Sequence, residues 1–226
     1  MATRVDAWLL LATALLLMAV GAVLLSRELA PYAYAYGTRQ QVLTRLAQAS
    51  PPIPPSISGT TLALETCANA LDDLQLRLGP TARRLGVADT CARAAEDAIR
   101  ALPGSSYAHY VSALANIRRN DPEAGLLALQ RSEAYGPTEQ WIAELRVRLA
   151  EDNFARLGPY AEEGHRADLA LLAQSRRGIR AVAARYVADA GFRERITRVV
   201  EALPMDVQQR FVSLVRAEAR AAGGGG

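Results

Sequence analysis

The sequence contains no lysine, so all 26 of its basic residues are arginines, and it has only two histidines and two cysteines. The arginine bias is typical of GC-rich genomes and by itself assigns no function. The histidines and cysteines lack the spacing of a four-ligand zinc site. C-x-x-C, H-E-x-x-H, G-x-S-x-G and glycine-rich phosphate-loop motifs are also missing. We therefore expect no enzyme activity, metal, cofactor or small-molecule substrate.

Strand patterns are missing as well. No stretch alternates apolar and polar residues, and runs of β-branched residues are scarce, so the sequence predicts an all-α fold. The one small basic cluster, residues 176–178, has no aromatic residues within it, and nucleic-acid binding is not expected.

The longest apolar run extends from Ala7 to Leu25 and carries no charge. As a helix it would measure about 28 Å, close to the hydrocarbon thickness of a bilayer. A cleaved signal peptide is the alternative, but its apolar region is shorter and its start more basic. The run therefore predicts a transmembrane anchor over residues 7–26 that contacts lipid.

Aromatic residues flank this run, as they do at membrane interfaces. They are Trp8, Tyr32, Tyr34 and Tyr36. Arginines are more frequent after the run than before it, which weakly favours a cytoplasmic domain. A short N-terminus before a single anchor usually remains in the cytoplasm, however. We expect a single-pass protein of a bacterial inner membrane whose soluble domain lies in the periplasm.

Turn signals divide the remaining chain into amphipathic helices. The expected helices cover 37–49, 60–78, 89–102, 106–119, 122–135, 138–157, 166–188, 192–203 and a last one capped by Asp206. Between the first two, the proline-rich segment 50–56 reads as a semi-rigid spacer that holds the next domain away from the bilayer. The expected regions are a cytoplasmic start (1–6), the anchor (7–26), a juxtamembrane helix and linker (27–59), a helical domain (60–157), arginine-rich helices (158–221) and a flexible glycine tail (222–226).

Pro103 and Pro137 each follow an alanine-rich helix, and the interval between them equals one tetratricopeptide repeat, about 34 residues. Residues 72–157 resemble an array of such repeats. In the first copy, Leu78-Gly79 matches the Leu-Gly pair of the family's helix A. Gly86 matches the glycine between the two helices, and Ala98 matches the small residue of helix B. The second copy, about 106–137, keeps the period and the proline but lacks the Leu-Gly pair. The resemblance implies a concave protein-binding surface without catalysis.

Cys67 and Cys91 lie at equal distances along the chain before and after Gly79. If the chain reverses at Gly79-Pro80, the two cysteines are level on antiparallel helices and can form a disulfide. If it reverses at Gly86-Val87, as the repeat alignment prefers, they are too far apart for the ~5.5 Å Cα separation that a disulfide needs.

One face of the helix expected at 106–119 is small and polar. It carries His109, Ser112, Ala113 and Asn116, with Tyr110 nearby. Two interpretations remain open: a groove that binds a segment of a partner protein, or a tight helix contact that requires small residues.

The C-terminal helices are rich in arginine, with a net charge of +5 over residues 166–220 from 11 arginines and 6 acids. An anionic partner or ordinary solvated helix faces would each explain this excess.

These patterns favour a membrane-anchored, non-enzymatic scaffold that binds protein partners in a bacterial envelope complex. The first alternative is an accessory subunit whose transmembrane helix packs inside a respiratory, export or polysaccharide complex. The second is an envelope enzyme that acts on a cell-wall or surface polymer, with Glu162, Glu163 or His165 in its site.

Overall fold

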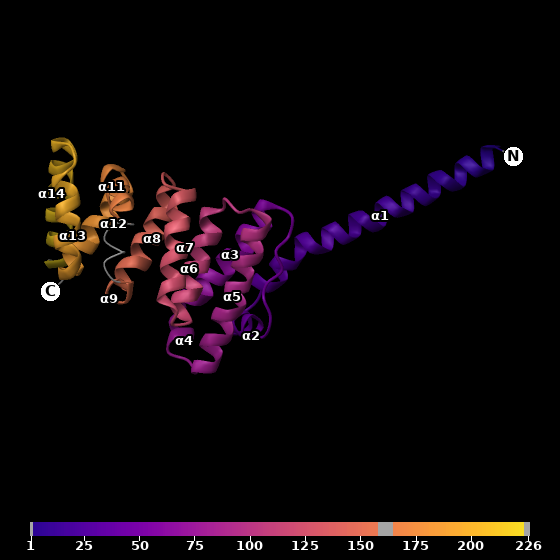
Figure 1. Cartoon of the computed structure of the whole chain (residues 1–226), viewed down its shortest axis with the longest axis horizontal. Coiled ribbons are helices and arrows are strands. Elements are labelled where there is room, and N and C mark those ends of the chain that lie inside the picture. Colours follow the sequence, from indigo (N-terminus) through magenta and orange to yellow (C-terminus); the bar gives the residue numbers. More distant parts are fainter. Residues whose placement is uncertain (1, 158–164, 224–226) are drawn as a thin grey trace. The chain divides into compact units, whose positions relative to one another are not determined.

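The computed structural model describes residues 2–157 and 165–223, and within these ranges every regular element is an α-helix (Figure 1). The expected all-α fold is confirmed. The chain forms two compact units, Met1–Ala101 and Leu102–Gly226.

The first unit begins with one long helix, α1 (Ala2–Ala35). Its segment Trp8–Ala35 is long and apolar enough to cross a membrane, and its most apolar window buries no side chain against the rest of the chain. A membrane anchor and a signal sequence both have these properties. The helix continues through Pro31, although proline donates no backbone hydrogen bond.

The helix expected at 37–49 is confirmed as α2 (Arg39–Gln48). Thr38 caps it, since its hydroxyl accepts a hydrogen bond from Gln41 N–H while the Gln41 side chain accepts one from Thr38 N–H. This reciprocal pair is the capping box that favours a helix start.

The proline-rich segment 50–56 is not helical, as expected, and it packs against its own unit; its role as a spacer from the bilayer stays a prediction. Ser50 donates a hydrogen bond to the Thr90 carbonyl oxygen at one end of the segment, and Ser56 donates two to the carboxylate of Glu28 at the other. Pro51 and Pro54 are buried. The proline rings therefore supply apolar surface for packing, and the segment folds back onto α1.

Three helices complete the first unit: α3 (Ile57–Asp72), α4 (Leu74–Arg77) and α5 (Thr81–Ala101). The chain turns at Gly79-Pro80, and Cys67 and Cys91 form a disulfide with a Cα–Cα distance of 5.4 Å. Of the two turns considered, the first is therefore correct.

Helix α5 starts at Thr81, before the expected start at residue 89. The chain does not turn at Gly86, which lies inside the helix. A Cβ at Gly86 would lie 3.1 Å from the Ala47 carbonyl oxygen. The glycine thus permits a close approach of α5 to the end of α2, rather than marking a turn.

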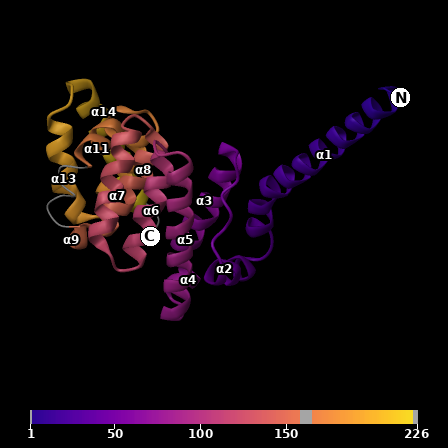
Figure 2. The same cartoon turned by 45° about the vertical axis from the view of Figure 1, so that its right-hand side comes forward.

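The second unit opens with α6 (Ser106–Arg118) and α7 (Pro122–Tyr135), which lie side by side and confirm two expected helices (Figures 1 and 2). Ser105 and Asp121 cap them. The stretch expected as one helix over 138–157 divides into α8 (Gln140–Asp152) and α9 (Phe154–Leu157).

The C-terminal part contains α11 (Arg166–Gln174), α12 (Gly178–Ala188), α13 (Ala190–Glu201) and α14 (Met205–Gly223). The single helix expected over 166–188 is wrong, since the chain breaks at 175–177. Ser175 accepts a hydrogen bond from Gly178 N–H across this break, and a Cβ at Gly178 would lie 2.9 Å from Leu172 Cα. Asp206 lies in the first turn of α14 instead of capping it.

These helices and α8 share one apolar core. Its buried members are Ala143, Val147, Leu169, Leu172, Ala173, Ile179, Val182, Ala183, Phe192, Ile196, Val199, Val200 and Phe211.

A tetratricopeptide stack is not confirmed. Helices α6 and α7 form the helical pair expected for the second copy. In the first copy, Leu78 and Gly79 both follow the short helix α4, with Leu78 as its C-cap, while Gly86 lies inside α5 rather than between two helices. The assignments of Leu78-Gly79 and Gly86 are therefore wrong, whereas Ala98 is a buried small residue of α5. The confirmed result is the all-helical class.

Candidate functional site

Arg146 is the largest fully buried side chain of the described residues, and it lies on the apolar face of α8. Its Nε and Nη2 donate to the two carboxylate oxygens of Asp168 on α11, at 2.7 and 2.5 Å. The remaining N–H groups reach the carbonyl oxygens of Ser132 and Gly136 and the Ser106 hydroxyl, at 3.2–3.3 Å. The guanidinium thus joins α6, α7, α8 and α11.

A second buried ionic cluster lies further along α8. The Glu151 carboxylate accepts a hydrogen bond from His165 Nε2 at 3.0 Å and is paired with Arg195 from α13. The Arg195 guanidinium also lies over the ring of Phe154, 3.8 Å from its centroid. Glu151 is fully buried and His165 is 5% exposed. A carboxylate at this position is stable because two hydrogen-bonded partners replace water.

Burial lowers the pKa of His165 to about 4, and the positive charges of Arg195 and Arg185 also lower it, against an opposing effect of Asp168. The imidazole is therefore neutral at neutral pH and carries its proton on Nε2, which faces Glu151. Its Nδ1 is buried and has no hydrogen-bond partner among the residues that the structure describes. That atom is a hydrogen-bond acceptor held in a fixed direction.

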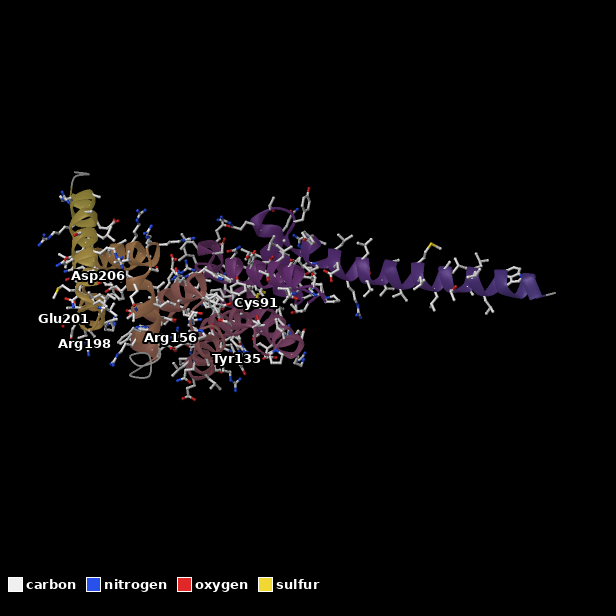
Figure 3. The ribbon with its side chains drawn as sticks, turned by 90° about the horizontal axis from the view of Figure 1, so that it is seen from above. Cys91, Tyr135, Arg156, Arg198, Glu201 and Asp206 are labelled. Atoms are coloured by element: carbon white, nitrogen blue, oxygen red, sulfur yellow. A yellow bond between two sulfur atoms is a disulfide. The ribbon has the colours of Figure 1, made fainter. Side chains whose placement is uncertain are left out.

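A pocket of about 290 Å³ lies between α11 and α13, beside this cluster. Its lining residues are His165, Arg166, Leu169, Ala170, Arg195, Arg198, Val199, Ala202 and Leu203. Arg198 projects from α13, shortly before Glu201 (Figure 3). The lining combines three arginines with apolar side chains, but Arg195 is already paired with Glu151 and Arg198 with Glu194. The described lining contains no hydroxyl, thiol or carboxylate that could act as a nucleophile.

No group of three or more His, Cys, Asp or Glu side chains in the described part of the chain could hold a metal ion. The expectations of no metal and no cofactor remain predictions, as do those concerning partners.

The enzyme alternative named three residues near 162–165. Glu162 and Glu163 lie outside the described residues. His165 is buried against Glu151, which sequence reasoning did not single out.

The expected partner-binding face lies on α6. His109 stacks on Tyr135, with ring centroids 5.1 Å apart, and its Nε2 lies 3.0 Å from the Pro103 carbonyl oxygen. A Cβ at Gly125 of α7 would lie 3.3 Å from the Ala113 carbonyl oxygen, so the two helices are in close contact there. These contacts favour the tight packing interpretation for His109 and Ala113. Tyr110 and Ser112 are also buried, and Asn116 is half-buried. Partner binding at this face remains a prediction.

The aromatic residues expected at the membrane interface differ in exposure. Trp8, Tyr32 and Tyr36 are exposed, and Tyr34 is half-buried. Tyr32 and Tyr34 belong to α1 itself, which extends past the predicted end of the anchor. Their place at an interface stays a prediction.

The buried pairs Arg146–Asp168 and Glu151–His165 were missed. One signal was available: Arg146 lies four positions after Ile142 and Glu151 four after Val147, so both charges occupy the apolar face of α8. A charge on such a face indicates a buried partner, but the partner's identity does not follow from spacing along the chain.

No protein-family model matches the sequence, and neither a curated protein nor a solved structure matches it. The function proposed below therefore depends on the molecule's own geometry.

Proposed function

We propose that this protein is a membrane-anchored, non-enzymatic scaffold that binds partner proteins of a bacterial envelope complex through its helical units. The observation that best supports this proposal is the exposure of the apolar part of α1. Its apolar part is exposed along its whole length, whereas its last turns pack against α3 of a disulfide-bonded unit. An exposed apolar surface of this size requires an apolar environment, which a bilayer supplies.

The disulfide supports an exported domain. Cys67 and Cys91 are both fully buried, and disulfides persist in oxidising compartments such as the bacterial periplasm. The short segment before the anchor then remains in the cytoplasm.

Reporter fusions test this topology. Alkaline phosphatase fused after Arg220 is expected to be active, and a cytoplasmic fluorescent protein fused there is expected to be dark. As a control, the pair Leu15→Arg and Leu16→Arg places two charges in the apolar run and should abolish membrane retention. An inactive phosphatase with a bright fluorescent fusion would overturn the exported assignment.

Affinity purification from mild detergent tests the scaffold role. A stoichiometric partner is expected, and a chain that migrates alone would contradict the proposal. Asn116→Arg tests the α6 face, because Asn116 is the one half-buried residue there. Ser213→Arg, at an exposed position of α14, is the matched control. Loss of the partner in the first variant alone would assign binding to the α6 face.

A second candidate is an accessory subunit held in a larger complex by α1 itself. Gly21 favours it, because no atom of another part of the described chain lies within 4 Å of a Cβ added there. With Ala14 and Ala22 it forms a small face on which another helix could pack. In that case Gly21→Leu should release the partner from detergent extracts, whereas Gly21→Ala should retain it.

The enzyme alternative makes a different prediction. If a polymer-cleaving site exists near His165, replacing Glu162 and Glu163 with alanine abolishes function. Under the scaffold proposal this change leaves partner binding intact.

A further inference from the structure

The contact between Glu28 and Ser56 fixes the folded part of the first unit at a defined height on α1. Glu28 follows Leu25 by about 4.5 Å along the helix axis, measured from the end of the apolar run. Its carboxylate accepts hydrogen bonds from Ser56 N–H, at 3.0 Å, and from the Ser56 hydroxyl. The start of α3 is therefore held beside the end of the apolar run.

The direction of α3 follows from a second contact region. A pocket of about 620 Å³ in the first unit is lined both by Ala35 and Gly37, which end α1 and follow it, and by Leu62, Thr66 and Asn69 of α3. Later residues of α3 thus lie beside later residues of α1. Both helices run in the same direction, and the N-terminus of α3 faces the apolar part of α1.

That N-terminus presents apolar side chains. Ile57, the first residue of α3, is 74% exposed. Pro55 before it is also exposed, and Leu29 on α1 is 55% exposed. We call Pro55, Ser56 and Ile57 the α3 tip. In water an exposed isoleucine at this position contributes no free energy of burial. In the interfacial layer of a bilayer its apolar surface is removed from water, which is favourable.

We infer that the α3 tip inserts into the interfacial layer of the bilayer, so that the first unit rests directly on the membrane. This inference depends on the proposed function, since it requires α1 to span the bilayer. The occupant of the tip surface is lipid, because the Glu28–Ser56 contact places the tip at the level where the apolar run ends. The headgroup layer extends about 5–7 Å beyond the hydrocarbon on each side, which includes the height of Glu28.

The other end of the same unit offers a matched control. Leu78 is 79% exposed, which is close to the exposure of Ile57. It follows α3 and α4, and α3 alone is about 24 Å long. Leu78 therefore has the same accessibility as Ile57 but should lie well outside the lipid layer.

Tryptophan quenching in vesicles tests the inference. The two native tryptophans are first replaced by Trp8→Phe and Trp141→Phe, and Ile57→Trp or Leu78→Trp is added to this full-length background. Each protein is reconstituted into phosphatidylcholine vesicles with bromine atoms near the glycerol end of the acyl chains. We expect the Ile57→Trp protein to lose about half of its emission relative to unbrominated vesicles, and the Leu78→Trp protein to lose almost none.

Three other outcomes overturn the inference. If both proteins float with the vesicles and neither is quenched, the tip does not touch lipid, although the anchor and the proposed function remain intact. If both are quenched equally, lipid contact is not specific to the tip. If the proteins do not associate with vesicles at all, the proposed function fails and the inference fails with it.

Discussion

The two units of this chain use different chemistry to hold their helices together. In the first unit a covalent bond joins α3 to α5 at Cys67 and Cys91, among small buried side chains such as Ala63, Ala70 and Ala95. The second unit contains no cysteine. Buried charged groups join its helices instead: the Arg146–Asp168 ion pair, and the Glu151 carboxylate, which pairs with Arg195 and accepts a hydrogen bond from neutral His165. The first arrangement depends on the redox potential of the compartment, and the second depends on pH.

This difference predicts that the units respond to separate perturbations. A disulfide is insensitive to moderate acid, whereas a buried histidine that is neutral in the fold is not. A reductant, in turn, should leave the second unit unaffected. Each of the four predictions that follow changes one unit. A response of the other unit would contradict the claim that the two units are stabilised independently.

The largest effect is expected for Asp168→Ala. Both side chains of the Arg146–Asp168 pair are 2% exposed, so the substitution leaves a buried, uncompensated guanidinium. Breaking such a pair typically lowers the unfolding free energy by about 3–5 kcal/mol. A domain of low stability could lose its entire unfolding free energy in this way. Urea unfolding in a Trp8→Phe background, followed by Trp141 fluorescence, measures it, because Trp141 lies on α8 with Arg146.

Asp206→Ala is the control, since Asp206 is exposed and should leave the midpoint unchanged. The pair Arg146→Met and Asp168→Leu should recover much of the loss, because apolar replacement of both partners removes the unpaired charge. An unchanged midpoint for Asp168→Ala would show that the pair does not stabilise the second unit.

The next effect concerns the disulfide of the first unit. Its cysteines are 24 residues apart, and closing a loop of this size corresponds to about 3.5 kcal/mol in the chain-entropy description. Cys67→Ala with Cys91→Ala, or a reductant, should therefore speed tryptic cleavage at Arg83 and Arg84, which are exposed on α5. The reductant should have no effect on the double variant, and Trp141 fluorescence should not change in either case.

Acid should destabilise the second unit. His165 in the unfolded chain takes up a proton near its ordinary pKa of 6.5, whereas the folded chain does so only near pH 4. Between these values the unfolded state binds more protons at His165, so the contribution of His165 to the unfolding free energy falls as pH decreases, by about 3 kcal/mol. Burial raises the pKa of Glu133, and that shift acts in the opposite direction.

Urea midpoints of Trp141 fluorescence between pH 7 and pH 4 measure this loss. His165→Gln should flatten the slope in that window. The pKa of Asp189 is lowered by its hydrogen bonds with Phe192 N–H and Arg185, so its effect on stability enters only at the acid end of this window, near and below its ordinary value of 3.8. A slope that persists in the His165→Gln variant would assign the acid effect to another group.

The smallest expected effect is that of Gly125→Ala. A Cβ there would lie 2.6 Å from Ile117 Cγ1 and 3.3 Å from the Ala113 carbonyl oxygen, so α6 and α7 must separate. Overpacking of this kind costs about 1–3 kcal/mol. Gly191→Ala is the matched control on α13, where the nearest atom lies at an ordinary 3.5 Å and alanine favours the helix. Equal thermal midpoints for the two variants would contradict close packing at Gly125.

The sequence predicts helices well where their ends have specific chemistry. Asp121-Pro122 starts α7 and Gly136-Pro137 follows it, and the structure places its ends there. The error at Gly86 has a physical cause, because a glycine in a helix serves either as a stop or as a site of close approach. Only the position of Ala47 in the folded unit distinguishes the two. The break at 175–177 was missed for the same reason, since it depends on packing of Gly178 against Leu172.

The candidate site was less predictable than the fold. His165 was singled out, but with neighbouring acids rather than with Glu151, which lies earlier in the chain on α8. Arg195 comes from a third helix, 44 residues from Glu151. Pairs of this kind depend on how α8, α11 and α13 pack, and no spacing rule within one helix predicts them. The disulfide was an open alternative, because the choice between two turns depended on the same kind of packing.

Thiol labelling of membranes tests the central claim, that α1 anchors an exported unit held by a disulfide. Membranes from a bacterial host that expresses the full chain are extracted with alkali, dissolved in SDS and treated with a polyethylene-glycol maleimide, with and without prior reduction. SDS exposes the buried cysteines, so labelling then reports only on their oxidation. We expect the chain to stay in the alkali-resistant pellet and to shift in a gel only after reduction. A chain in the supernatant, or one labelled at Cys67 and Cys91 without reductant, would contradict the claim.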